Sequence, residues 1–323
     1  MPEIIDGDFQ EKSSNHEDVF DQIERLKKET DTVILAHYYQ EDDIQDIADF
    51  IGDSLDLSRK AQSAKEKRIL FCGVHFMAET AKILNPEKTV LVPDMKAGCS
   101  LADNCKPNEF QAFIEAHPDH LVISYINCSA DVKAMSDIIV TSSNAVQIVD
   151  ALPRSQKIIF APDKYLGAWV AKQTGRHDMI LWEGSCIVHE NFSHKQLVKL
   201  RVQHNDAKII AHPECPQELL NEADFIGSTR KLLNFISEDE SQKYIILTEA
   251  GIIHQMKKSQ PHKDFIAGLT EDESCHCNLC PFMRLNTLEK VHNALITNEP
   301  QIHLPEETRI RAEKSLLKML ELS

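Results

Sequence analysis

Cysteines are the residues of this chain best suited to metal chemistry. Nine are spread over 323 residues, and three turn-like segments carry one or more of them. Cys99 lies in VPDMKAGCSLAD, Cys186 in LWEGSCIVHE, and Cys275, Cys277 and Cys280 in SCHCNLCPFM. An odd number of cysteines without an export signal favours metal ligands or buried thiols over a disulfide framework. Three separate thiolates could hold a [4Fe–4S] cluster with one iron left open, and such an iron would act as a Lewis acid in a dehydration.

Pairs of polar side chains, two residues apart, end three apolar segments that read as buried strands. The pairs are His37 and Tyr39 in TVILAHYYQ (32–40), Tyr125 and Asn127 in HLVISYINC (120–128), and His212 and Glu214 in AKIIAHPEC (207–215). Side chains alternate along a strand, so both members of a pair are expected on one face. Such groups can transfer protons and orient a polar substrate.

A hydroxyl residue follows the first member of each pair at the same distance. Ser54, Ser142 and Thr229 lie 17 residues after His37, Tyr125 and His212, where a further strand ends and a helix begins. A serine or threonine there can cap the helix, and the free N–H groups beside it can bind a carboxylate or phosphate.

These residues recur because the chain repeats about every 90 residues. Second strands are predicted at 68–76, 157–165 and 243–251, with helices after them, and each unit then ends at a cysteine segment. The alternation of strands and helices predicts an α/β protein with small parallel sheets. Ligands bind beyond the carboxyl ends of parallel strands, so units arranged around a pseudo-threefold axis would share one central site.

The repeat divides the chain into an N-terminal arm and three α/β units. We expect the arm at 1–18, the first unit at 19–105 plus 283–323, the second at 106–190 and the third at 191–282. Two amphipathic helical segments, RLNTLEKVHNALI and PEETRIRAEKSLLKMLEL, are expected to pack on the first unit and complete it.

The charge balance excludes several classes of partner. Asp and Glu outnumber Lys and Arg by 51 to 35, for a formal net charge of −16. Nucleic acid and anionic membranes need a basic face, which the sequence does not offer. No apolar run approaches the length of a membrane span, and the polar N-terminus lacks the features of an export signal, so a cytoplasmic protein is expected.

Nine short motifs resemble those of the quinolinate synthase family, the quinolinate synthetase A protein or NadA family of NAD biosynthesis. They are LAHYYQ, GDSLDLS, GCSLAD, YINCSADVKA, VTSSNAV, GSCIVHE, AHPEC, IGSTR and CPFMRLNTLEK, and the similarity runs from about residue 20 to about residue 300. The resemblance implies a triangle of three-layer α/β/α domains with a central [4Fe–4S] cluster. It also implies a reaction in which iminoaspartate and dihydroxyacetone phosphate give quinolinate, phosphate and two waters. L-aspartate oxidase or aspartate dehydrogenase would supply the iminoaspartate.

The resemblance also assigns roles to residues of this chain. It implies cluster ligation by Cys99, Cys186 and Cys280. The substrate contacts that it implies are His37, Tyr39, Ser54, Tyr125, Asn127, Ser142, His212, Glu214, Ser228 and Thr229. Chemistry then favours Glu214 as the base, His212 as its partner or a phosphate ligand, and Tyr39 and His37 as groups that close over the substrate.

The third cluster ligand has competing candidates. Cys99 and Cys186 lie 62 and 61 residues after the first polar residue of their units, and the matching distances are 63 for Cys275, 65 for Cys277 and 68 for Cys280. Spacing alone thus favours Cys275 or Cys277, whereas the resemblance favours Cys280. Cys275, His276, Cys277 and Cys280 could instead bind structural zinc, and Cys277 and Cys280 could form a redox-sensitive pair.

Two other functions, and structural roles for several cysteines and histidines, stay open beside the leading hypothesis. A different [4Fe–4S] hydro-lyase of the aconitase type would need no phosphate-bearing substrate, and a non-catalytic iron–sulfur sensor would need a partner surface. Radical chemistry is disfavoured because a C-x₃-C-x₂-C motif is absent from the sequence. We interpret the remaining cysteines and histidines as buried thiols and hydrogen-bonded structural residues: Cys72, Cys105, Cys128, Cys215, His75, His189 and His254.

Overall fold

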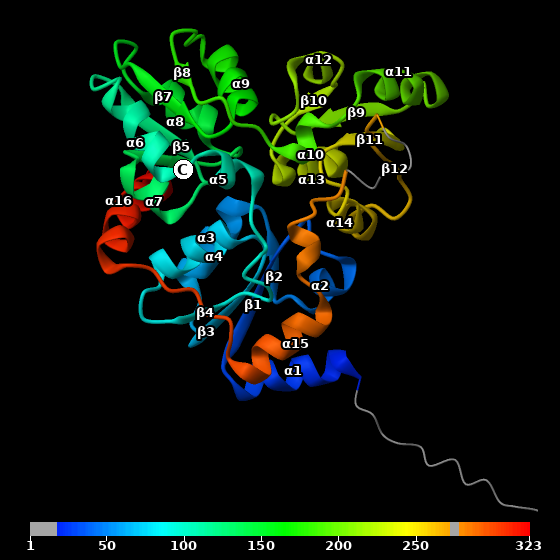
Figure 1. Cartoon of the computed structure of the whole chain (residues 1–323). Coiled ribbons are helices and arrows are strands. Elements are labelled where there is room, and N and C mark those ends of the chain that lie inside the picture. Colours follow the sequence, from blue (N-terminus) through cyan, green and yellow to red (C-terminus); the bar gives the residue numbers. More distant parts are fainter. Residues whose placement is uncertain (1–17, 272–277) are drawn as a thin grey trace, which may run out of the picture.

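Three lobes, each built on a four-stranded parallel sheet, make up the computed structural model (Figure 1). It describes residues 18–271 and 278–323. The first lobe contains α1 Val19–Glu29, β1 Thr32–His37, α2 Asp42–Ile47, β2 Phe50–Gly52, α3 Ser54–Ser63, β3 Arg68–Cys72, α4 His75–Leu84, β4 Thr89–Leu91 and α5 Ser100–Asn104. The second contains α6 Pro107–Glu115, β5 Leu121–Tyr125, α7 Ala130–Met135, β6 Ile138–Val140, α8 Ala145–Ala151, β7 Ile158–Ala161, α9 Lys164–Thr174, β8 Ile180–Leu181 and α10 Ile187–Glu190. The third contains α11 His194–Gln203, β9 Lys208–Ala211, α12 Gln217–Leu220, β10 Phe225–Ile226, α13 Thr229–Glu238, β11 Lys243–Leu247, α14 Ile252–Ser259 and β12 Asp264–Ala267.

The three sheets have the same strand order. It is β2-β1-β3-β4 in the first lobe, β6-β5-β7-β8 in the second and β10-β9-β11-β12 in the third, and all the pairs within them are parallel. The first strand of each lobe lies inside its sheet and is almost completely buried, as its continuous apolar sequence predicts. The predicted α/β class with three repeated units is therefore confirmed.

An aspartate before the second strand of each sheet strengthens the repeat. Its carboxylate accepts a 2.8 Å hydrogen bond from the backbone N–H of the residue 15 positions earlier, in the first strand. The pairs are Asp49 with Ile34, Asp137 with Val122 and Asp224 with Ile209. The same contact recurs in three lobes, so the repeat extends to individual side chains.

The sequence predicted three of the four strands of each sheet and missed the last one. The apolar runs at 68–76, 157–165 and 243–251 form β3, β7 and β11, whereas the short strands β4, β8 and β12 before the cysteine segments were not foreseen. The polar pairs also differ from the expectation. Strands end at His37, Tyr125 and Ala211, so the second member of each pair lies in a turn and does not alternate along a strand.

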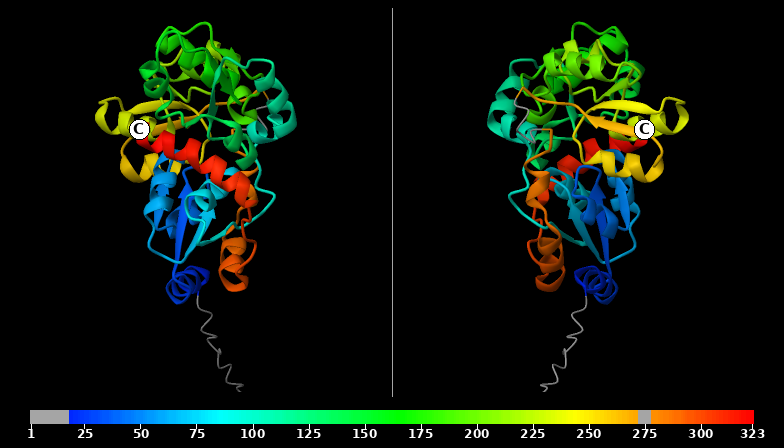
Figure 2. Two further views of the ribbon diagram at one scale, coloured as in Figure 1. Left: turned by 90° about the vertical axis from the view of Figure 1, so that its left-hand side faces the viewer. Right: turned by 90° about the vertical axis from the view of Figure 1, so that its right-hand side faces the viewer.

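The two C-terminal helices divide between two lobes. α15 (Leu288–Thr297), which follows the 3₁₀ turn Met283–Leu285, packs against α1 in the first lobe as expected. α16 (Glu306–Leu322) was expected there too, but it packs mainly on α7 and β6 of the second lobe and lies between the first and second lobes in Figure 2. Its buried face belongs to a core that both lobes share, and Ser315 Oγ donates a 2.8 Å hydrogen bond to the carbonyl of Lys133 in α7. The expectation was wrong because an amphipathic pattern shows that a face is buried but not against which partner.

The domain boundaries drawn from the repeat remain a prediction. Within the described residues, no helix has the length and apolar character needed to cross a membrane.

Candidate active site between the three lobes

One cavity collects groups from the carboxyl ends of all three sheets. Of the residues that the resemblance implies as cluster ligands or substrate contacts, all except Ser228 line it: His37, Tyr39, Ser54, Cys99, Tyr125, Asn127, Ser142, Cys186, His212, Glu214, Thr229 and Cys280. Ser228 does not line it and lies completely buried behind Thr229. Among the residues that the structure describes, no lysine or arginine reaches the cavity wall.

The helices that begin at the cavity are capped by neighbours of the predicted hydroxyl residues. Asp53 caps α3, with its carboxylate accepting from Leu55 N and Asp56 N, and Ser228 caps α13. Ser54 and Thr229 are therefore the first helical residues, which leaves their side chains free to face the cavity. The expectation that they cap was wrong because an aspartate or serine one residue earlier already occupies the cap position.

A joint of three side chains holds these helix starts together. Ser143 Oγ lies 2.7 Å from Asp53 Oδ2 and 2.7 Å from Ser228 Oγ, so each lobe contributes one residue. The neighbours of these three residues in the chain are Ser142, Ser54 and Thr229. The joint therefore positions three cavity hydroxyls relative to one another.

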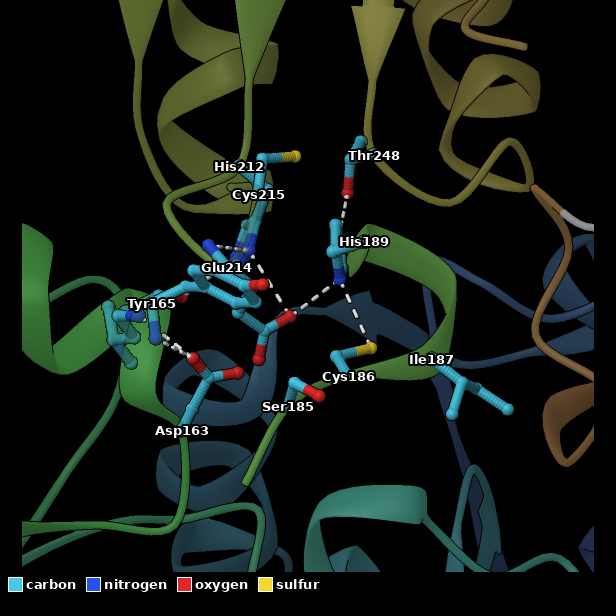
Figure 3. A network of polar contacts seen from close by, with 12 residues as sticks. Asp163, Tyr165, Ser185, Cys186, Ile187, His189, His212, Glu214, Cys215 and Thr248 are labelled. Atoms are coloured by element: carbon cyan, nitrogen blue, oxygen red, sulfur yellow. Dashed lines mark hydrogen bonds and ion pairs between the residues drawn. The ribbon is translucent and has the colours of Figure 1, made fainter. Parts of the chain in front are cut away.

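Glu214 lines the cavity and is held by two imidazoles (Figure 3). Its Oε2 lies 2.7 Å from His189 Nδ1 and 3.3 Å from His212 Nδ1, and His212 Nε2 lies 3.2 Å from Ser142 Oγ. Burial alone would raise the pKa of Glu214, but the two imidazoles override burial and lower it. Glu214 is thus held in its ionised carboxylate form beside the two imidazoles.

His189 connects Glu214 to one of the cysteines. Its Nδ1 also lies 3.2 Å from Cys186 Sγ, and the three donor atoms of this group all lie within 4.8 Å of one another. Burial lowers the pKa of His189, so the ring is neutral. We expected His189 to be a hydrogen-bonded structural residue, and it is hydrogen-bonded, but it also lines the cavity. By contrast, His75 and His254 are not part of the cavity wall.

The three cavity cysteines are free thiols in the described part of the chain. Burial raises the pKa of Cys99 to about 12 and that of Cys280 to about 11, and it raises that of Cys186 well above the usual range. Metal ions bind the thiolate form, so these buried thiols would ionise when a cation binds beside them. Cys72, Cys105, Cys128 and Cys215 are completely buried outside the cavity wall. Cys275, His276 and Cys277 lie outside the described residues.

Two residues of the cavity wall, Glu214 and Asn127, each carry a buried acceptor atom without a hydrogen-bond partner among the described residues. Within the described residues, neither Glu214 Oε1 nor Asn127 Oδ1 has a hydrogen bond, although both atoms are shielded from solvent. Buried polar atoms are nearly always satisfied in folded proteins, so these two indicate a bound ligand or ordered water. Burial raises the pKa values of Tyr39 and Tyr125 well above normal, which keeps both phenols neutral hydrogen-bond donors.

Two buried carboxyl groups near the cysteine segments were missed in the sequence. Glu249 follows β11 and lines the cavity; it accepts a 3.0 Å hydrogen bond from Cys280 N, and burial raises its pKa to about 7. Asp163 follows β7, caps α9 through Oδ1 and leaves Oδ2 buried without a partner among the described atoms. Each lies two residues beyond the observed strand, inside the segments 157–165 and 243–251 that were predicted as strands. The signal was therefore a carboxylate at the end of the second apolar run of a unit.

Comparison with known proteins supports a single family. The family model described as the quinolinate synthetase A protein matches residues 21–321. Proteins named quinolinate synthase from Nostoc sp. and Trichodesmium erythraeum are each 60% identical to this chain over 306 and 307 residues, which is 95% of this chain and 94% of each relative. One from Chloroherpeton thalassium is 55% identical over 306 residues, which is 95% of both chains. The predicted resemblance and the prediction of an enzyme are thereby confirmed, and the chain belongs to the quinolinate synthetase A protein family.

Proposed function

We propose that the protein condenses iminoaspartate with dihydroxyacetone phosphate to give quinolinate, phosphate and two waters. The observation that carries this proposal is the convergence of three thiols, one from each lobe and its cysteine segment, with a buried carboxylate in one cavity. Three relatives named quinolinate synthase, similar over nearly their whole length, support quinolinate as the product.

Cys99, Cys186 and Cys280 are the residues that would hold a [4Fe–4S] cluster. All three line the same cavity, and each comes from a different lobe or the cysteine segment that follows it. When bound, a cluster with three cysteine ligands supplies an open iron that polarises a substrate hydroxyl or carboxylate. Glu249 supports this site because it fixes the backbone N–H of Cys280 at 3.0 Å.

Glu214 is the proposed base of the reaction. Imine and enol chemistry requires repeated proton transfer, and Oε1 of Glu214 is a buried carboxylate oxygen without a hydrogen-bond partner among the described residues. His212 and His189 hold the other oxygen, so the carboxylate cannot turn away from the substrate. His37 is deeply buried, which lowers its pKa to about 3, so it acts as a neutral group that orients the substrate.

Helix starts and neutral donors would bind the two anionic substrates. Thr229 opens α13, whose neutral cap Ser228 accepts from Lys231 N, so the N–H groups before Lys231 can attract carboxylate and phosphate oxygens. Ser54 would contribute its hydroxyl, because the carboxylate of Asp53 already caps α3. Such binding explains how an acidic protein holds anions at a wall to which no described lysine or arginine contributes. Asn127 and Tyr125 would orient the carbon skeleton, and Tyr39 would close over it. Ser228 would act indirectly, by capping α13 and positioning Thr229.

The deciding experiment starts with anaerobic purification and analysis of iron and sulfide. The cluster-loaded protein is then incubated with iminoaspartate and dihydroxyacetone phosphate, and quinolinate is measured. Quinolinate that forms only with both substrates supports the proposal. A loaded protein that makes none contradicts it, and dehydration of a hydroxy acid without the phosphate compound would indicate a simple hydro-lyase.

Separate cysteine variants identify the third ligand. Cys280→Ser should abolish cluster loading, whereas Cys277→Ser should leave iron and sulfide near the wild-type level. Cys72→Ala is the matched control, because this thiol is buried in β3 outside the cavity wall. Loading that is lost with Cys277→Ser and kept with Cys280→Ser would reverse the assignment.

A further inference from the structure

Thr248 occupies an unusual place just behind the cavity. It follows β11 in the third lobe, its side chain is completely buried, and it is not among the residues of the cavity wall. Its hydroxyl lies 2.8 Å from Tyr39 Oη of the first lobe. It also lies 2.9 Å from His189 Nε2 of the second lobe (Figure 3). A single hydroxyl therefore joins side chains from all three lobes.

The direction of these hydrogen bonds follows from the chemistry of the partners. The carboxylate of Glu214 can only accept, so the ring nitrogen of His189 that faces it at 2.7 Å must carry the hydrogen. A neutral imidazole has one N–H, which makes its other nitrogen an acceptor for the hydroxyl of Thr248. The oxygen of Thr248 is then free to accept from the phenol of Tyr39. The link itself depends on the two distances and holds in either direction.

We propose that Thr248 is a positioning residue that locks the Tyr39 phenol to the His189–Glu214 pair. The inference rests on the proposed function in one respect: Tyr39 and Glu214 must both act on the substrate for the lock to affect turnover. Thr248 itself touches no substrate. It sets the distance between a group that closes over the cavity and the pair that holds the base.

The alternative is that Thr248 only fills space in the core. Valine has nearly the shape of threonine but neither donates nor accepts, so Thr248→Val separates the two explanations. The lock predicts that kcat/KM for quinolinate formation falls about tenfold or more, because two buried partners lose a hydrogen bond. Thr248→Ser restores the hydroxyl and should restore the rate.

Two arms test this proposal on the full chain. The first measures kcat and KM for cluster-loaded Thr248→Val, Thr248→Ser, Tyr39→Phe and the Tyr39→Phe/Thr248→Val double variant. If Thr248 acts through the phenol, Thr248→Val adds much less to Tyr39→Phe than it does to the wild type. Thr174→Val is the matched control, since Thr174 is a buried threonine whose hydroxyl donates a 2.8 Å hydrogen bond to Val170 O inside α9.

The second arm does not depend on the reaction. Nitrogen NMR of ¹⁵N-histidine-labelled protein, with His189 assigned by comparison with His189→Gln, reports whether Nε2 accepts a hydrogen bond. The Nε2 resonance should move toward that of a free unprotonated imidazole nitrogen in Thr248→Val and stay in place in Thr248→Ser. If Thr248→Val does not fold, Thr248→Ala removes the same two bonds with less crowding.

The outcomes separate the lock from the proposed function. Additive effects of Thr248→Val and Tyr39→Phe, or an unmoved Nε2 resonance, would overturn the lock even if the wild-type enzyme makes quinolinate. A wild-type protein that makes no quinolinate would overturn the proposed function, while the NMR arm would still decide whether Thr248 is bonded to His189.

Discussion

Replacing Ser143 with alanine tests whether the joint of the three helix starts is held by hydrogen bonds. The Ser143 hydroxyl has one proton, and the charged Asp53 Oδ2 at 2.7 Å is the better acceptor. Ser228 then donates to Ser143 Oγ across the second 2.7 Å contact. Alanine removes both bonds and leaves the Asp53 oxygen in a site that is 5% exposed.

The expected magnitude follows from these two bonds. A hydrogen bond to a charged group contributes about 1.5–3 kcal/mol and a neutral one about 0.5–1.5 kcal/mol. Asp53 keeps two backbone N–H donors on Oδ1, at 3.0 Å each, so its charge stays partly compensated. We therefore expect Ser143→Ala to lower the free energy of unfolding by about 2–3 kcal/mol.

Urea denaturation followed by circular dichroism measures this loss. Ser237→Ala is the matched control, because Ser237 makes an exposed bond to Leu233 O within α13 and should change stability by less than about 0.5 kcal/mol. The joint also positions Ser54, Ser142 and Thr229, so KM for dihydroxyacetone phosphate should rise more than kcat falls. A Ser143→Ala protein as stable as the control would refute the reasoning and show that packing alone aligns the three helices.

Three further predictions concern groups near the cavity. Glu214→Gln should keep iron and sulfide at the wild-type level but slow quinolinate formation about 10²–10⁴-fold, and full turnover would remove Glu214 from the mechanism. Burial, with the nearby charge of Glu214, raises the pKa of Asp163 well above 3.8, so the folded state binds this proton more tightly than the unfolded chain. Stability should therefore fall as the pH rises through the folded-state pKa of Asp163. Asp163→Asn keeps the Oδ1 cap, so the melting temperature of this variant should fall less over the same pH range. Identical pH profiles of the two proteins would contradict this prediction. Gly184→Ala would place a Cβ atom against the carbonyl oxygen of Pro162, closer than van der Waals contact allows, so the melting temperature of the variant should drop clearly. An unchanged melting temperature would show that this turn can shift.

The repeat made most of the fold predictable from sequence. Buried parallel strands read as continuous apolar runs, and the same polar landmarks after them marked where the sheets end. The strands that escaped prediction are β4, β8 and β12, which are only two to four residues long. So short a segment carries too little periodicity to be distinguished from a loop.

The site was predictable in its residues but not in its contacts. Sequence spacing brought His212 and Glu214 together, because they are two residues apart in one turn. No spacing rule could place His189 beside Glu214 at 2.7 Å, since the two belong to different lobes and meet only when the lobes pack. The roles of Thr248 and Ser143 were not predicted for the same reason. Each residue joins lobes, and a sequence pattern within one unit cannot show such a contact.

The repeat explains where polar side chains lie around the cavity, but it does not explain which chemical groups they carry. The three lobes supply equivalent positions at the strand ends, but the side chains placed there are not equivalent: His37 and Tyr39, Tyr125 and Asn127, His212 and Glu214. Only the third pair carries a carboxylate, and the imidazole of the second lobe's His189 holds it. Three copies of one architecture can thus surround a substrate, while only one of the three polar pairs supplies a carboxylate. We expect function to be most sensitive at the contacts between lobes, because those contacts convert three similar units into one asymmetric site.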